Sequence, residues 1–222
     1  MPAGRCTSAA TPACSRNAST QQMARDERVE FAEFLEGLTP EQWDSPTLCD
    51  KWRVREVAIH TVSYDELSTP GLVARFLKGR LSTDRINAVG VADYVDRTTE
   101  QIVAMIRGNT EPHGLTAGFG GKIALTDGMI HQQDIRRPLG LPRTIDPERL
   151  RTALDFARFA PTIRGAWRAR GVRLVATDLD WSYGNGPEVH GTGEALLMVM
   201  AGRRAALDDL DGPGKAKLAQ RF

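Results

Sequence analysis

The chain has 222 residues, of which 29 are basic and 28 acidic, so its formal net charge is only +1. This balance argues against a nucleic-acid-binding protein, which normally carries a basic patch or stripe. Hydrophobic residues make up 41% of the chain, which is enough for a core at this length. No apolar run reaches the roughly 18 residues of a transmembrane helix. We therefore expect a globular protein with neither a membrane span nor a nucleic-acid partner.

The three cysteines are Cys6, Cys14 and Cys49. An odd and sparse set does not form a disulfide framework, which predicts a reducing compartment such as the cytoplasm. The first twenty residues are rich in Ala, Ser and Thr and lack the apolar run of a signal peptide. We expect Met1–Gln22 to be a disordered tail with unstructured thiols, or the natural start to be Met23.

Five helices are expected next, each from an apolar stripe on one helix face. They cover Arg25–Leu38, Val54–Leu67, Gly71–Ala88, Ala92–Arg107 and Lys122–Arg137. Trp43 and Trp52 lie in the connection Pro40–Trp52, which is too apolar to be left unpacked. Because the connections are of the usual length for neighbouring helices, residues 23–142 predict an antiparallel bundle of the four-helix type.

Residues 143–222 predict a small α+β domain. A helix is expected over Pro147–Phe159, and two further helices over Gly193–Ala201 and Arg203–Leu210 are separated by Gly202. Short strands are expected at Val172–Ala176, Asp180–Tyr183 and Pro187–His190. The turn residues 184–187 (GNGP) predict that the last two strands form a hairpin. The fold class is therefore mainly α, with a small α+β C-terminal part.

Two histidines stand where helices should bury aliphatic residues. His60 falls in the stripe of the second helix, while Asp127, His131 and Asp134 are spaced by four and three residues and so share one helix face. Ionisable groups rarely face a core unless they are paired or bind a metal. This pattern predicts a divalent metal bound by His60, Asp127 and His131, with one open position as in catalytic zinc sites. Nickel, cobalt or manganese would also suit these N and O ligands.

The spacing leaves alternatives open at each position. A single buried histidine such as His60 is more often a hydrogen-bonded core residue than a ligand. Asp134 would either orient a ligating imidazole or form an ion pair along the helix with Arg136 or Arg137.

Other conspicuous residues have simpler interpretations. Cys49 is expected to be a small buried packing residue rather than a nucleophile or ligand. Trp43 and Trp52 are expected in the core or in a pocket wall. His113 and His190 are expected at the surface. The glycine-rich residues 118–121 lack the preceding strand of a dinucleotide-binding fingerprint.

Three stretches of the chain point to one family. Trp43–His60 (WDSPTLCDKWRVREVAIH) has a Trp, a Thr-Leu-Cys-x-x-Trp segment and a helix ending in His. Asp127–Asp134 (DGMIHQQD) is similar to an E-x-x-x-H-x-x-D helix, and Ala195–Gly212 (ALLMVMAGRRAALDDLDG) has a Gly-Arg pair before a final helix. Together they resemble the DinB-like, mycothiol-dependent maleylpyruvate isomerase family, from roughly Arg25 to the C-terminus.

This resemblance implies a metal site at His60, Asp127 and His131, with zinc as the first expectation. It also implies mycothiol as a thiol cofactor whose sulfur acts at or near the metal. Arg203 would lie near the pocket and pin a substrate carboxylate, the alternative being a surface or helix-capping arginine. The family usually has Glu where this chain has Asp127, which shortens the reach by about 1.5 Å, so the helices would lie closer or a water would bridge.

The function expected is that of a metal-dependent thiol enzyme acting on a small electrophile. The metal would lower the pKa of a bound thiol, and the thiolate would add to an electrophilic carbon. An isomerase would add it to a double bond, allow rotation and release it, whereas an S-transferase would release a thioether. Two alternatives remain: a non-enzymatic bundle that binds a ligand or partner through a hydrogen-bonded cluster, and a metal-dependent hydrolase without a thiol.

Overall fold

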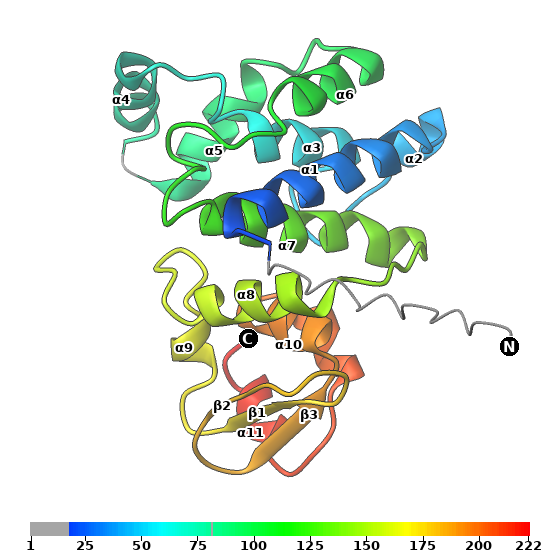
Figure 1. Ribbon diagram of the computed structural model, residues 1–222, viewed down its shortest axis with the longest axis vertical. Coiled ribbons are helices and arrows are strands. Elements are labelled where there is room, and N and C mark those ends of the chain that lie inside the picture. Colours follow the sequence, from blue (N-terminus) through cyan, green and yellow to red (C-terminus); the bar gives the residue numbers. More distant parts are fainter. Residues whose placement is uncertain (1–17, 81) are drawn as a thin grey trace, which may run out of the picture.

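The computed structural model describes residues 18–80 and 82–222 and shows a helical N-terminal part above a smaller C-terminal part with a three-stranded sheet (Figure 1). The N-terminal part forms α1 (Thr20–Glu36), α2 (Pro40–Trp43), α3 (Val54–Val62), α4 (Thr69–Lys78), α5 (Thr83–Ala92), α6 (Thr99–Gly108) and α7 (Lys122–Leu139). The C-terminal part forms α8 (Pro147–Ala157), α9 (Gly165–Arg168), β1 (Arg173–Ala176), β2 (Ser182–Gly184), β3 (Glu188–Gly191), α10 (Gly193–Met200), the 3-10 helix η1 (Arg204–Asp209) and α11 (Lys215–Ala219).

The predicted fold class is confirmed, while the domain boundary predicted near residue 142 stays a prediction. Among the helices described, none has the length and apolar character needed to cross a lipid bilayer.

Helix α7 lies between two hydrophobic cores and contributes side chains to both. It packs against α1 and α3 on one side and against α8 on the other. Ile135 joins the core of the N-terminal helices, whereas Leu125 and Met129 join the core of the C-terminal part. Burying such a side chain contributes roughly 1.5–3 kcal/mol. Because apolar side chains hold α7 from both sides, the polar side chains it carries are fixed in position.

The chain becomes helical earlier than expected. Ser19 Oγ accepts the backbone N–H of Gln22 at 3.2 Å, which satisfies a free donor of the first turn. Helix α1 therefore begins at Thr20, and the predicted tail is wrong for residues 20–22. Residues 1–17 of that tail, with Cys6 and Cys14, lie outside the described residues.

The predicted helix Gly71–Ala88 is two helices, α4 and α5. The chain turns at Gly79, where an added Cβ would lie only 2.4 Å from Ile86 Cγ1, so glycine permits the close return of α5. The following residue, Arg80, has a φ of 52°. An apolar stripe can continue across such a turn, which is why the pattern alone did not predict the break.

The helices that flank this pair also end differently from the prediction. Helix α3 ends at Val62, not at Leu67. The predicted helix Ala92–Arg107 is wrong at its start, because Ala92 ends α5 and α6 begins only at Thr99. There Thr98 and Gln101 form a reciprocal capping box that starts the new helix.

The predicted hairpin of the C-terminal part is also wrong. Strand β1 lies in the centre of the sheet, with β2 antiparallel on one side and β3 parallel on the other. Arg173 pairs with Gly184 on one side and Glu188 on the other, so the turn predicted from residues 184–187 crosses the end of β1. At Gly186 the φ is 129° and an added Cβ would lie 2.4 Å from Gly171 O. The turn signal was correct, but it could not show which strand each arm pairs with.

Candidate metal centre

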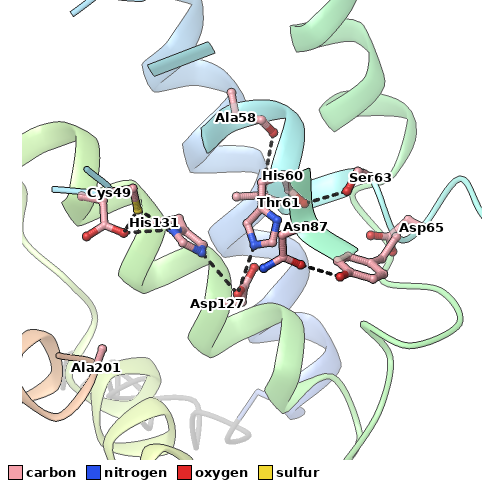
Figure 2. A network of polar contacts seen from close by, with 12 residues as sticks. Cys49, Ala58, His60, Thr61, Ser63, Asp65, Asn87, Asp127, His131 and Ala201 are labelled. Carbon is pink, nitrogen blue, oxygen red and sulfur yellow. Dashed lines mark hydrogen bonds and ion pairs between the residues drawn. The ribbon is translucent and has the colours of Figure 1, made fainter. Parts of the chain in front are cut away.

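The three predicted ligands meet between α3 and α7 (Figure 2). His60 lies in the last turn of α3, while Asp127 and His131 lie one turn apart on α7. His60 is 6% exposed and His131 8% exposed, but the Asp127 side chain is 41% exposed. The cluster is therefore closed by protein on the imidazole side and reached by solvent on the carboxylate side.

The ligand atoms lie close enough together for one ion to bridge them after small movements. Asp127 Oδ1 lies 3.5 Å from His131 Nε2 and 3.9 Å from His60 Nε2, and all three atoms are within 4.8 Å of one another. Two ligand atoms each about 2.1 Å from a tetrahedral ion lie roughly 3.4 Å apart. Asp127 thus reaches both imidazoles despite being one methylene shorter than the Glu of the resembling family.

Among the described residues, none forms a hydrogen bond with the ring of His60. Nδ1 is buried and has no partner in that part of the chain, and Nε2 faces Asp127 across a distance too long for a hydrogen bond. Trp52 packs against the ring, with centroids 4.9 Å apart. Burial, only partly opposed by the charge of Asp127, lowers the pKa of His60 to about 4. The imidazole is neutral at pH 7, which is the form that binds a metal, and Nε2 is the ring nitrogen that faces Asp127.

His131 is held from the opposite side by Asp134. Its Nδ1 donates to Asp134 Oδ2 at 2.9 Å, which turns Nε2 toward Asp127. Burial disfavours the charged ring, but the charge of Asp127 and hydrogen bonds with Asp127 and Asp134 raise the pKa of His131 well above its usual value. Burial likewise disfavours the Asp127 anion, yet His131 and His60 lower the pKa of Asp127 to about 2. The cluster therefore contains an ionised carboxylate at neutral pH.

Asp134 in turn is held by Arg203 from the C-terminal part. The guanidinium donates from Nε to Asp134 Oδ1 at 2.9 Å and from Nη2 to Asp134 Oδ2 at 2.5 Å, and Nη1 donates to Ala201 O at 2.8 Å. Asp134 thus contacts His131 rather than Arg136 or Arg137. A substrate carboxylate would have to use the Arg203 N–H groups that these acceptors leave over, so the predicted substrate contact stays a prediction.

Cys49 has a more polar environment than the predicted packing role implied. The residue is half-buried, and its Sγ donates to Asp134 Oδ2 at 3.1 Å. The sulfur also lies 3.8 Å from His131 Nδ1 and 3.7 Å from Arg203 Nη2. The sequence could not show this, because the three partners come from distant segments.

The remaining predictions on single residues agree with the structure. Trp43 is 4% exposed in the N-terminal core. His113 is exposed in its loop, and the His190 side chain is 40% exposed beside Glu188. Residues 118–121 form the turn before α7, with Gly121 at the helix N-cap.

Arg75 is a neighbour of the site that sequence reasoning missed. It is 2% exposed, donates to Ser63 O at 2.9 Å and lies over the ring of Tyr64. Tyr64 lies edge-on to His60 and donates to Asn87 Oδ1 at 2.5 Å. The available signal was a charged residue in the middle of the apolar stripe of α4, the same kind of signal that pointed to His60.

Comparison with known proteins identifies the family. The sequence model of the mycothiol maleylpyruvate isomerase N-terminal domain matches residues 24–179, well over half of the chain. The chain belongs to this family. The mycothiol maleylpyruvate isomerase family is the one that the three sequence stretches predicted.

Two solved structures share the fold with this family member. One is the crystal structure of a histidine-to-alanine mutant of the mycothiol-dependent maleylpyruvate isomerase, with a TM-score of 0.58, 14% identity, and coverage of 88% of this chain and 92% of that one. A crystal structure titled simply as the mycothiol-dependent maleylpyruvate isomerase gives a TM-score of 0.52 at 11% identity, with the same coverage. Among curated proteins no match is found.

Proposed function

We propose that this chain is a metal-dependent enzyme that uses mycothiol to isomerise a small electrophilic substrate or to transfer the thiol to it. Membership of an isomerase family supports an enzymatic role, and His60, Asp127 and His131 are the proposed ligands. The observation that best supports the proposal is the distance from Asp127 Oδ1 to the two Nε2 atoms, 3.5 Å for His131 and 3.9 Å for His60. Within the described part of the chain, the His60 ring has no hydrogen bond that would compete with an ion. Zinc fits these ligands, as do other divalent ions of intermediate softness.

Each residue of the cluster has a distinct task in this proposal. A divalent ion bound there would supply a positive charge that lowers the pKa of a thiol toward neutrality. His60 offers a neutral nitrogen, and Asp127 offers an anionic oxygen on the solvent side. Asp134 keeps the proton of His131 on Nδ1, so that Nε2 is free to bind. The substrate and the thiol would enter past the exposed carboxylate, because protein covers the imidazoles.

One observation favours the non-enzymatic alternative. Without an ion, a protonated His131 can pair with Asp127 and Asp134, as its raised pKa indicates. The cluster would then be a buried polar network in a binding protein. Metal analysis separates the two functions, because only the enzyme requires the ion.

The first experiment measures metal content in the purified full chain. We expect one divalent ion per chain in the wild type and loss of binding in His60→Ala and in His131→Ala. His113→Ala removes an exposed loop imidazole instead, and it should keep the full metal content. Full metal content in both His60→Ala and His131→Ala would rule out the proposed metal site.

The second experiment tests the thiol. Mycothiol should bind saturably to the metal-loaded protein, and chelator treatment should remove that binding. Metal-loaded protein that does not bind mycothiol would leave the hydrolase as the better function. The predicted cytoplasmic location stays a prediction outside these two measurements.

A further inference from the structure

His131 belongs to two sets of metal-ligating side chains, not one. Its Nε2 faces His60 and Asp127, whereas its Nδ1 faces Cys49 and Asp134. In each set the three ligand atoms lie within 4.8 Å of one another. The Cys49 set offers a sulfur, a nitrogen and an oxygen, which zinc and cobalt bind well. Nothing in these ligand types alone directs an ion to the His60 set.

The side chain that distinguishes the two sets is Arg203. Its guanidinium makes two hydrogen bonds with the Asp134 carboxylate and lies 3.7 Å from Cys49 Sγ. A protein cation therefore already occupies the position next to the Cys49 set. The Asp134 side chain is fully buried, so little water screens this pair. Burial opposes the charge of Arg203, but the hydrogen bonds and charge of Asp134 raise its pKa, and the guanidinium stays protonated.

We infer that Arg203 is a positioning residue that keeps the metal out of the Cys49–His131–Asp134 set and directs it to the His60–Asp127–His131 set. This inference rests on the proposed metal-dependent function. A divalent ion in the Cys49 set would be repelled by the positive guanidinium beside it. It could bind Asp134 only by displacing Arg203 from that carboxylate. Among the described residues Asp134 is the one acid paired with Arg203, so the displaced guanidinium would be left without a counterion.

Arg203 also fixes which nitrogen of His131 is free. Because the guanidinium holds both oxygens of Asp134 in place, the carboxylate stays aligned to accept Nδ1–H. Because Nδ1 keeps its proton, Nε2, on the side of Asp127, is the nitrogen that loses its proton when an ion binds. One contact from the C-terminal part thus excludes the ion from one ligand set and prepares the other.

Cobalt provides the test, because a cobalt–thiolate bond gives a near-ultraviolet charge-transfer band that N and O ligands do not give. The full chain, freed of metal by a chelator, is titrated with Co²⁺. We expect the wild type to bind one equivalent without that band. In Arg203→Met the band should appear and grow to the intensity of one thiolate per cobalt. Adding Cys49→Ser should remove it. Arg203→Lys keeps the positive charge and should show no band.

The outcomes are separable. Arg203→Met that binds cobalt without the band overturns the inference and leaves the proposed function intact. A wild type that already shows a Cys49-dependent band also overturns it. A wild type that binds no cobalt overturns the proposed function and this inference with it. If Arg203→Met loses the wild-type circular dichroism, Arg203→Gln takes its place.

A second measurement needs no change at Arg203. In a chain carrying Cys6→Ser and Cys14→Ser, Cys49 is the one remaining thiol. A thiol reagent should modify Cys49 at the same rate with and without bound cobalt. Protection of Cys49 by cobalt would show that the ion lies in the Cys49 set, against the inference.

Discussion

Two polar clusters are buried against α7, and they differ in whether their charges balance. The arginine cluster consists of Glu27 and Glu30 from α1 with Arg143 and Arg149. Glu27 is fully buried, and its carboxylate accepts from Arg143, Arg149 and Gln132. Two carboxylates thus meet two guanidinium groups.

The candidate metal centre lacks this balance. Asp127 and Asp134 are both anions at neutral pH, since the pKa of each lies below its usual value. Arg203 supplies one positive charge and His60 is neutral. One further positive charge is required, from a protonated His131 or from a bound ion. Both clusters join the two parts of the chain, but of the two only the unbalanced one has a reason to bind a cation.

The largest effect is expected from removing the charge of Glu27. Glu27→Gln leaves two buried guanidinium groups short of a counterion, which should lower the free energy of unfolding by about 3–5 kcal/mol. Urea unfolding measures this. Glu33→Gln, an exposed change on the same helix, should stay within about 0.5 kcal/mol of the wild type. The metal content of folded Glu27→Gln should be unchanged. A loss of metal would show that the arginine cluster also supports metal binding, against the separation of the two clusters.

A smaller effect on binding is expected at Asp134. Asp134→Asn loses the ion pair with Arg203 and weakens the hold on His131 Nδ1, so metal affinity should fall about 10–100-fold. Competition with a chromophoric chelator measures the affinity. Asp96→Asn, at an exposed position, serves as the control. An unchanged affinity in Asp134→Asn would show that the orientation of His131 does not depend on this carboxylate.

The charge count also predicts how binding depends on pH. At pH 7 His60 is already neutral, whereas the raised pKa of His131 keeps that ring protonated in the metal-free protein. Metal binding should therefore release one proton, and below the pKa of His131 the affinity should fall about tenfold per pH unit. Calorimetry in two buffers of different ionisation enthalpy counts the proton. Release of no proton, or of two protons, would contradict the charges assigned to His60 and His131.

The smallest effect is expected from lengthening Asp127. Asp127→Glu adds one methylene, about 1.5 Å of reach, to a carboxylate that already lies close to both imidazoles. The affinity should change by less than about tenfold, or ~1.4 kcal/mol. A gain in metal affinity of a hundredfold or more in Asp127→Glu would mean that the shorter Asp127 side chain does not serve as a ligand.

The three residues of the proposed metal site were predictable from local patterns. Asp127 and His131 follow helical spacing, and His60 interrupts an apolar stripe. Their meeting also required the packing of α3 on α7, which spacing cannot give and the family resemblance supplied. Arg203 and Asp134 were each singled out, but their ion pair was not predicted, because that contact depends on how the C-terminal part packs against α7.

The fold was predictable where a signal is local. Helix α7 was correct to within two residues, because an apolar stripe and a terminal glycine mark it. The break between α4 and α5 was missed because apolar residues continue through Gly79. The position of β3 was missed because strand pairing is a long-range choice, and the alternating pattern of a strand does not name its neighbour.

The contact between Trp52 and His60 has a practical consequence. Because the indole ring packs on the imidazole of a proposed ligand, it would serve as an intrinsic optical probe of metal binding. A paramagnetic ion such as Cu²⁺ bound to His60 would quench the emission of Trp52 by proximity. Occupancy of the site could then be followed in the unlabelled protein, and rapid mixing would give the rate at which the ion enters.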